Sequence, residues 1–507
     1  MGEANSDGTD IAEVSVIHAI VIPNYMEEID TIKETLAVLA FHPQAYCSYD
    51  VFLAMEQREV NSETKALSLI QMFATRFRSI DYTVHPADIP GEAAGKGSNI
   101  GWAARYLSAK YSTETRKSVI VTGIDADSHL LPSYFTKITK MHLSHSATAN
   151  TTLYSVPIIF DRNAHNVPAI VRVADILWSA AGISGLHRSS ATAPPTSVYS
   201  LPLELIDRVG GWDGDAEAIG EDLHMYLKCF FALNGNLTCR TVLSPVSQSN
   251  VTGGGKGGIR GTIIDMRARY NQALRHMWGA LDVGFALRQA VKMWRERQHT
   301  TRAFYPLHKN VAVNPNCCFP NGRLHNGNTQ LPDETGNFSD ITHATVKGPH
   351  WENLIYLFHR LFEAHFLPVH MTILVLTLAL YDWVSADMQY SNGLRRIFSL
   401  CSVLRMLGFL EVGYYIFLYE GFHRLCVMTR KRAMTYAGLA DEMYFSQRSI
   451  RKNLVDYALV PLVAPLYGAI PCAQAATTHF WTVDLVYSVS KKASRQQQKP
   501  ALPGSMA

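Results

Sequence analysis

This sequence lacks C-x-x-C cysteine pairs, a strong excess of basic residues and an apolar leader. Its eight cysteines form no C-x-x-C pair, and the adjacent Cys317 and Cys318 suit neither a disulfide framework nor a zinc site. The formal net charge is +3, far from the basic character of nucleic-acid binders, so no nucleic-acid partner is expected. The acidic, polar residues 1–13 predict a disordered leader rather than a signal peptide. We therefore expect reduced thiols, either in the cytosol or buried in a membrane.

Up to about Gly284, short strand-like runs alternate with runs of helical spacing. Apolar, β-branched or aromatic runs at 14–22 and 49–55 predict strands, and 31–42 and 64–77 predict helices. This alternation is typical of βαβ units with a mainly parallel sheet. Because ligands of such sheets bind beyond the carboxyl ends of the strands, the polar residues after each strand are the candidates for a site.

Polar residues follow each predicted strand. PNYMEE, with Pro23 and Glu27, follows the first strand, and Glu56 follows the second. Residues 91–106 then place Lys96 between two glycines at the start of a predicted helix. Glycines let the backbone approach an anion and a helix N-terminus favours negative charge, so this lysine indicates an anion site. The sequence has no G-x-x-x-x-G-K-[ST] phosphate loop, and GKG taken alone is more often a turn.

A further predicted strand, at 118–124, ends on two carboxylates one residue apart, Asp125 and Asp127. If the segment is extended, both side chains point to one side and repel each other unless a cation lies near them. Carboxylate oxygens suit Mg²⁺ or Mn²⁺, which take their remaining ligands from water and substrate phosphates. The alternative is a solvated turn with two acids, which D-x-D by itself would favour.

The segment GGWDGDAEAIGEDLHMYLK (210–228) predicts a helix that begins with two acids. Glu221 and Asp222 open this helix, and its apolar positions include Leu223 and Leu227. Carboxylates are stabilised at a helix N-terminus, so an ordinary helix-start signal is the alternative to a catalytic pair.

A second helix is predicted for RARYNQALRHMWG (267–279). Its spacing places four chemically distinctive residues on one face. They are Gln272, Arg275, His276 and Gly279. A surface helix shows the same pattern, so this helix alone does not indicate a site. The occurrence of all these segments in this order is much stronger evidence for one.

Taken together, the segments resemble glycosyltransferase family 2, whose members are inverting enzymes on the α/β nucleotide-diphospho-sugar fold called GT-A. IPNYMEE resembles the opening P-x-x-E of that family, GKGSN its glycine–lysine stretch, and IDADS its metal-binding D-x-D. GGWD…EDLHMYLK resembles G-G-W-D…E-D-x-x-L, and QALRHMWG resembles Q-x-x-R-W-x-x-G. The resemblance covers roughly residues 15–285 and implies a GT-A catalytic domain over 14–285. A membrane region follows, as in cellulose-, chitin- and hyaluronan-synthase-like members, and HFWTVDLVYSVSKK (479–492) resembles an ending seen in some of them.

The resemblance also implies a chemistry. In this family an acceptor hydroxyl attacks the anomeric carbon of a nucleotide sugar, often a UDP-sugar, so that an α-linked donor gives a β-glycoside. Asp222 would then be the general base. Asp127 would hold Mn²⁺ or Mg²⁺, with Asp125 beside it on the ribose or metal side, and Arg275 would pair with the diphosphate. Further residues implied for the donor are Pro23, Glu27, Glu56 and Lys96, and for the acceptor Glu221, Gln272 and His276.

Two positions depart from the family pattern. Glu56 stands where many members have Asp. The tryptophan of Q-x-x-R-W is His276 here, and Trp278, two residues later, lies on another helix face. The usual platform for the acceptor sugar is therefore altered, and a polymerising activity does not follow from the resemblance. A growing polysaccharide, a lipid and a small metabolite all stay open as acceptors.

Behind the catalytic domain, residues 286–365 predict interfacial helices. The amphipathic runs 287–298 and 351–366 are expected either to lie in the membrane interface or to pack on the catalytic domain. Between them, 300–350 is rich in Pro, Asn and Gly and predicts an irregular insertion. The last residues, 490–507, predict a disordered tail.

Three apolar stretches, 366–384, 397–419 and 454–481, predict transmembrane segments in contact with membrane lipids. Three prolines interrupt the last stretch, which would then be either a span or a re-entrant hairpin. Arg405 and Glu411 lie within the second stretch, where ionisable groups usually mark function.

Charge predicts the orientation of the membrane region. The positive-inside rule places a basic loop at 423–452, and with it the catalytic domain, in the cytosol of a multi-pass membrane protein. The alternative to an enzyme is a membrane transport or scaffold protein with a degenerate transferase domain. The presence of Asp125, Asp127 and Asp222 favours the enzyme.

Overall fold

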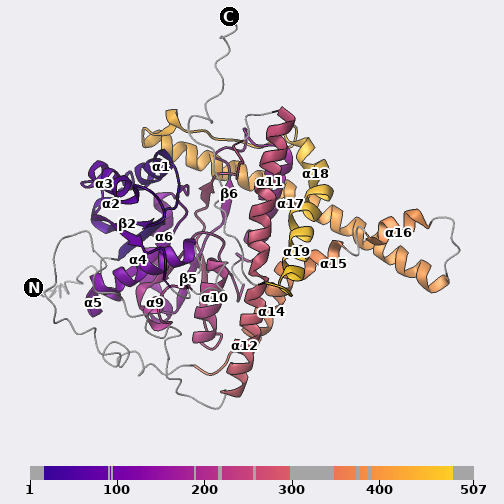
Figure 1. Ribbon diagram of the computed structural model, residues 1–507, viewed down its shortest axis with the longest axis horizontal. Coiled ribbons are helices and arrows are strands. Elements are labelled where there is room, and N and C mark those ends of the chain that lie inside the picture. Colours follow the sequence, from indigo (N-terminus) through magenta and orange to yellow (C-terminus); the bar gives the residue numbers. More distant parts are fainter. Residues whose placement is uncertain are drawn as a thin grey trace, which may run out of the picture.

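A computed structural model describes most of the chain (Figure 1). The predicted leader at 1–13, the predicted tail at 490–507 and nearly all of the predicted insertion at 300–350 lie outside the described residues. The residues described are 16–89, 92, 95–187, 190–214, 220–254, 258–296, 347–372, 377–385 and 391–482.

A seven-stranded mixed sheet lies at the centre of the N-terminal half, with strand order β3-β2-β1-β4-β7-β5-β8. Strands β1 to β4 are parallel, as the alternation of strands and helices predicts, whereas β7 runs antiparallel to β4 and β5. A second, two-stranded sheet pairs β6 with β9. The bounds are β1 Ile17–Pro23, β2 Tyr49–Glu56, β3 Ser79–His85, β4 Val119–Gly123, β5 Thr152–Ser155, β6 Ile158–Phe160, β7 Tyr199–Pro202, β8 Thr238–Thr241 and β9 Val246–Gln248.

Helices cover both faces of the large sheet. Side chains of α1, α3 and α6 form the core on one face, and those of α4, α9 and α10 form it on the other. Burial on both sides explains why these strands read as continuous apolar runs. The bounds are α1 Ile29–Ala40, α2 Ala45–Ser48, α3 Ser62–Phe73, α4 Lys96–Lys110, α5 Thr113–Arg116, α6 Pro132–Ser144, α7 Ser146–Ala149, α8 Ala169–Ser184, α9 Leu203–Arg208, α10 Glu221–Ala232, α11 Gly258–Met277 and α12 Leu281–Arg295.

The carboxyl ends of β1 and β2 are tied to the start of α4. The backbone N–H of Asn24 donates to the carbonyl of Ala54 (2.8 Å), and the Asn99 side-chain amide donates to the same carbonyl (2.7 Å). These two bonds hold the loop after β1, the end of β2 and the first turn of α4 at one edge of the sheet. The polar residues that follow the strands are thereby brought together.

The helices on either side of the predicted insertion pack on the catalytic core. Phe285 and Met293 of α12 and Leu357 and Leu361 of α14 (Trp351–His365) are buried in the same cluster as α4 and α10. The buried faces of these helices therefore pack on the catalytic domain, which is one of the two predicted arrangements. A domain boundary at residue 285 falls inside α12.

The C-terminal half is helical. In Figure 1, α16 and the beginning of α17 project from the body, whereas α11 and α19 stand side by side. At its other end α17 reaches the catalytic domain, where Met434 packs against Val38 and Leu131. The bounds are α15 Leu367–Thr372, α16 Leu378–Val384, α17 Asn392–Tyr436, α18 Leu454–Ala464 and α19 Ile470–Thr478, with a π-helical turn at Pro465–Ala469 joining the last two.

Two helical segments have the length and apolar composition needed to cross a membrane, Asn392–Tyr436 and Leu454–Thr478. They include most of the predicted spans 397–419 and 454–481. The second forms one continuous 25-residue helix rather than the re-entrant hairpin that its prolines allowed. In the described part of 366–384 the chain forms only the short helices α15 and α16.

The basic segment at 423–452 is not the free loop that the sequence predicts, because α17 continues through its first half. Arg430, 3% exposed, pairs with Asp161 at 2.7 Å. Arg448 pairs with Glu420 at 2.6 Å and with Asp456 at 2.7 Å. These arginines neutralise buried carboxylates. Arg430 fixes α17 to the catalytic domain, and Arg448 joins α17 to α18.

Replacing Arg430 with Met should leave the Asp161 carboxylate, 0% exposed, buried without its cation. Because breaking a buried pair typically costs about 3–5 kcal/mol, the thermal unfolding temperature of detergent-solubilised protein should fall clearly. Adding Asp161→Asn should recover part of the loss. Arg424→Met, at an exposed position of the same helix, is the matched control, with an expected change below about 0.5 kcal/mol. Equal unfolding temperatures for Arg430→Met and the unaltered protein would show that this pair does not anchor α17.

Candidate active site

A cavity of about 1520 Å³ opens where the loops after β1, β2 and β4 meet, and continues between α8, α11, α14, α17 and α18. It exceeds the roughly 300–1,000 Å³ of most small-ligand pockets. The predicted site residues that line it are Pro23, Glu27, Glu56, Lys96, Asp125, Glu221, Asp222, Gln272, Arg275 and His276. Asp127 is not among the lining residues.

The loop after β1 is held by one carboxylate. Glu59 accepts from the Asn24 side chain at 2.5 Å and from the backbone N–H of Met26 at 3.0 Å. Lys65 pairs with Glu59 at 2.7 Å and also donates to the backbone carbonyl of Glu27. The short segment from Pro23 to Glu27 is thus held in place by Glu59 and Lys65, with Glu27 on the cavity wall.

Glu56, at the end of β2, is buried and already paired. Arg58 contacts it at 2.8 Å and His85 at 3.2 Å, and His85 also reaches Glu92 at 3.0 Å. Burial lowers the pKa of His85, but its hydrogen bonds to Glu56 and Glu92 outweigh this, so the pKa is raised. Arg58 lines the cavity as well. Sequence reasoning missed Arg58, since no motif singles it out.

Lys96 lies among three carboxylates. Its ammonium is 3.1 Å from Asp125 and 3.3 Å from Glu221, and it donates to the Ser197 carbonyl at 2.7 Å. Burial lowers the pKa of Lys96, but Asp125, Glu221 and Asp222 raise it more, so the side chain is charged. The predicted anion site therefore already has anions, supplied by the protein itself. Gly97 lets α4 come this close, because a Cβ there would lie 3.1 Å from the Glu221 Cβ.

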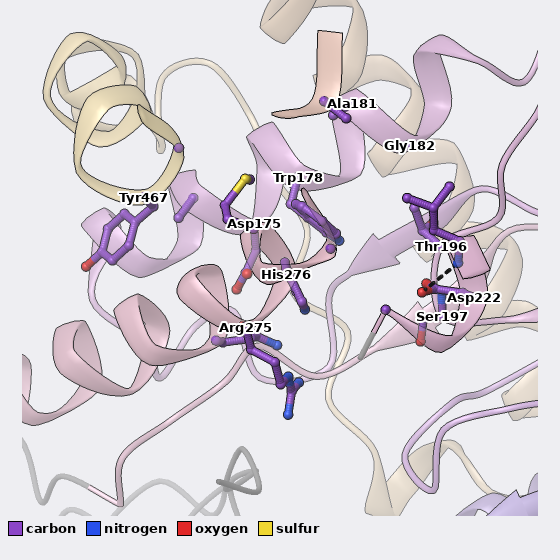
Figure 2. Close-up of a pocket in the computed structure, with 18 of the residues that line it drawn as sticks. Asp175, Trp178, Ala181, Gly182, Thr196, Ser197, Asp222, Arg275, His276 and Tyr467 are labelled. Carbon is purple, nitrogen blue, oxygen red and sulfur yellow. Dashed lines mark hydrogen bonds between the residues drawn. The ribbon is translucent and has the colours of Figure 1, made fainter. Parts of the chain in front are cut away.

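Ser197 forms hydrogen bonds with both Asp222 and Asp125. Its backbone N–H donates to Asp222 Oδ2 at 2.7 Å (Figure 2), and its hydroxyl donates to Asp125. Its φ of 69° lies in the left-handed region, which is uncommon for serine and often found at functional sites. Nothing in the sequence around Ser197 signals this role.

The neighbouring acids Glu221 and Asp222 differ in what surrounds them. Glu221 is buried and accepts from the Tyr199 hydroxyl at 2.7 Å. Burial raises its pKa, although Lys96 lowers it in part. Asp222 is only half-buried and lines the cavity. The helix start therefore leaves Asp222 partly exposed to the cavity and keeps Glu221 buried.

The D-A-D segment is a turn and not an extended chain. The N–H of Ser128 donates to the Asp125 carbonyl at 2.9 Å, which closes the turn. The Asp125 side chain is 24% exposed and lines the cavity. Asp127 is 1% exposed and accepts from the Ser249 N–H at 3.0 Å. The prediction of an extended segment is wrong, because the chain turns here, and of the two acids only Asp125 lines the cavity.

The donors available for a divalent cation follow from this geometry. Within the described residues, no three His, Cys, Asp or Glu side chains gather as a metal site. Mg²⁺ and Mn²⁺ in nucleotide sites commonly use one or two carboxylates, with phosphate and water oxygens completing the shell. Asp125 fits that role because its carboxylate faces the cavity. Asp127 is placed to support the turn that carries Asp125.

The predicted helix at 267–279 forms the end of α11, and its predicted face lines the cavity (Figure 2). His276 stacks on Trp178 of α8, with ring centroids 4.2 Å apart and planes at 28°. Burial, and then the charges of Arg275 and Arg269, lower the pKa of His276, so its ring is neutral. Trp278 instead packs against His479. Trp178 therefore supplies the aromatic face beside His276, and sequence spacing gave no sign of it.

The cavity also reaches the apolar helix α17. Arg405 and Glu411 both line it. Arg405 donates to Ser402 on its own helix at 2.7 Å. Arg360 of α14 also lines the cavity and pairs with Glu363 at 2.7 Å. Charged residues of both α14 and α17 therefore contribute to the lining of the cavity.

The sheet and this cavity define an α/β enzyme whose acids and bases meet beyond the carboxyl ends of its strands. A family described as Glycosyl transferase family group 2 matches residues 120–416, more than half of the chain. The chain belongs to this family of glycosyltransferases, which confirms the resemblance seen in the motifs. None of the curated proteins matches the sequence.

Several solved structures are similar at low identity. The mannosyltransferase PcManGT from Pyrobaculum calidifontis, in complex with GDP-Man and Mn²⁺, is 13% identical with a TM-score of 0.41, covering 88% of this chain and 87% of that one. Glucosyl-3-phosphoglycerate synthase from Mycobacterium tuberculosis, with Mn²⁺, UDP and glucosyl-3-phosphoglycerate, is 16% identical with a TM-score of 0.29, covering 49% and 79%. TarS from S. aureus is 11% identical with a TM-score of 0.29, covering 46% of this chain and 36% of TarS, so the chain spans little more than a third of that protein.

Proposed function

We propose that the protein is a membrane-bound, inverting glycosyltransferase that moves a sugar from a nucleotide sugar, expected to be a UDP-sugar, to an acceptor hydroxyl. The observation that carries this proposal is the meeting of Asp222, Asp125 and Arg275 in one cavity. An acid that can take a proton, a cavity-facing metal ligand and a guanidinium for a diphosphate are the groups that sugar transfer needs.

The donor is proposed to lie along the edge of the sheet. Its nucleoside would contact the loop after β1, with Pro23 and Glu27, and the end of β2, with Glu56. The diphosphate would lie near Asp125 and Arg275, whose planar guanidinium can pair with two phosphate oxygens. A bound Mn²⁺ or Mg²⁺, held through Asp125, would stabilise the negative charge of the leaving diphosphate.

The transfer itself is a single displacement. The acceptor oxygen forms a bond to the anomeric carbon while the bond from that carbon to the diphosphate oxygen breaks. The nucleoside diphosphate leaves with the electron pair, and the acceptor proton passes to Asp222. The Ser197 N–H, 2.7 Å from Asp222 Oδ2, fixes the orientation of this base. One displacement inverts the configuration, so an α-linked donor gives a β-glycoside.

The membrane arrangement is proposed from the C-terminal helices. Two helices long enough to span, together with the exposed basic residues Arg424, Lys431 and Arg432 near the end of α17, favour a cytosolic catalytic domain. The buried ion pair between Arg430 and Asp161 supports this arrangement, because it keeps the basic segment beside that domain. Nucleotide sugars are made on the cytosolic side.

The competing proposal is a transport or scaffold protein with a degenerate transferase domain. Turnover distinguishes the enzyme from the degenerate domain. An enzyme releases nucleoside diphosphate from a nucleotide sugar, and a degenerate domain does not. The test is diphosphate release by detergent-solubilised protein over a panel of nucleotide sugars, with native membranes as the acceptor source. Release from none of the donors would favour the degenerate domain.

Asp222→Asn should still bind nucleotide sugar but lose transfer by roughly 10²–10⁴-fold, the usual contribution of a general base. Glu221→Gln is the matched control and should cost less, because Glu221 contacts Lys96 and Tyr199 rather than facing the cavity freely. Both variants are measured for transfer and for nucleotide-sugar affinity. A larger loss in Glu221→Gln than in Asp222→Asn would show that the base is misassigned.

EDTA should abolish turnover, and Mn²⁺ or Mg²⁺ should restore it. Asp125→Ala should abolish turnover at any Mn²⁺ concentration tested. Asp127→Asn should only raise the Mn²⁺ concentration needed, by roughly 10- to 100-fold, as is usual when the support of a metal ligand is lost. If Asp127→Asn abolished turnover and Asp125→Ala only raised the Mn²⁺ concentration needed, Asp127 would be the metal ligand. Near-normal turnover in EDTA would contradict the metal assignment.

A further inference from the structure

Beside Asp222 the cavity has a second polar wall that the transfer step does not use. Asp282, in the first turn of α12, lines the cavity and is 1% exposed. Its Oδ1 bonds to His224 Nδ1 at 2.6 Å. Its Oδ2 is buried and has no hydrogen-bond partner among the described residues. An unpartnered buried carboxylate oxygen is costly, so a donor from outside the protein would stabilise it.

Two glycines keep the space around this oxygen open. A Cβ on Gly220, the residue before the catalytic acids, would lie 3.3 Å from Asp282 Oδ2. A Cβ on Gly279 would lie 3.4 Å from the same oxygen and 3.5 Å from His365 Nε2. His365, at the end of α14, is buried and also lines the cavity. The oxygen and the imidazole therefore border one small space next to the start of α10.

The charges around this space select its occupant. Burial raises the pKa of Asp282 to about 6, the His224 hydrogen bond opposes this, and Asp213 and Asp222 add to it. Burial lowers the pKa of His365 to about 4, so its ring is neutral. Of the two groups that border the space, Asp282 therefore brings negative charge and acceptors, and the neutral His365 brings no cation. A phosphate or carboxylate would bring only further acceptors and repulsion, whereas a hydroxyl brings a donor.

We propose that Asp282 and His365 form a subsite that binds hydroxyl groups of a carbohydrate acceptor beside Asp222. The proposal rests on the proposed glycosyltransferase function. It selects a sugar among the acceptors left open by the sequence, and excludes a lipid phosphate or an acidic metabolite as the attacking group. A free oligosaccharide and a lipid-linked sugar offer the same hydroxyl chemistry, so both are used as probes.

The test compares acceptors and variants with the donor that the panel identifies. The probes are a neutral oligosaccharide, an alkyl glycoside in detergent micelles and a polyprenyl phosphate. Asp282→Asn should raise the KM of the sugar acceptors by roughly 10- to 100-fold, the usual loss for a hydrogen bond to a charged group. The Kd of the nucleotide sugar should stay within about twofold, because no contact with the donor is proposed for Asp282.

Gly279→Ala tests the same space while leaving the Asp282 side chain and its bond to His224 chemically unchanged. Its methyl group would fill the subsite at van der Waals distance, so the KM of the sugar acceptors should rise as well. Gly284→Ala is the matched control on the same helix as Asp282, because its Cβ would meet only the flexible Arg288 side chain, 3.5 Å away. The KM should be unchanged in that variant.

Three outcomes would overturn the subsite. The first is an unchanged sugar KM in Gly279→Ala, which decides the matter even if Asp282→Asn fails to fold. The second is transfer to the polyprenyl phosphate in preference to both sugars. The third is wild-type protein that releases no diphosphate from any donor, in which case the proposed function fails and the subsite with it. The first two leave diphosphate release intact, so they are distinguishable from the third.

Discussion

Three carboxylates meet around the ammonium of Lys96, and the rest of the site depends on how their charges are balanced. Asp125 and Glu221 contact that ammonium directly, and Asp222 adds to its field. Like charges placed this close are stable together only with a cation or hydrogen-bond donors between them. Lys96 supplies the cation, and Ser197 supplies the donors. The start of α4, the turn after β4 and the start of α10 are held together by the same contacts, so the position of Asp222 is a consequence of charge balance.

The sequence predicts the sheet and most of the site because both depend on local patterns. Apolar runs identify β1, β2 and β4, and the residues directly after them line the cavity. Contacts between segments distant in the chain are different. Trp178 stacks on His276 from almost a hundred residues away, and Ser197 reaches Asp125 and Asp222 from an irregular loop. No spacing rule connects such residues, since only the folded sheet brings them together.

Two expectations of local structure fail for the same physical reason. The extended geometry expected for D-A-D fails because a backbone hydrogen bond turns the chain immediately after β4. The free loop expected at 423–452 is in part the end of α17, and Arg430 and Arg448 are buried against carboxylates. In both cases the partner in a specific hydrogen bond or ion pair, which the sequence pattern does not reveal, overrides the local structure that the pattern predicts. The pair between Arg430 and Asp161 anchors α17, and Arg405 and Glu411 of the same helix line the cavity.

The central claim is a single displacement with Asp222 as the base, and the anomeric configuration of the product tests it most directly. The measurement is an NMR spectrum of the product formed from an α-linked nucleotide sugar, with the coupling constant of the transferred anomeric proton as the readout. The account predicts a β-linkage, because one attack at the anomeric carbon inverts it. An α-linked product would contradict the account, since retention requires a second displacement or a different arrangement of the reacting groups.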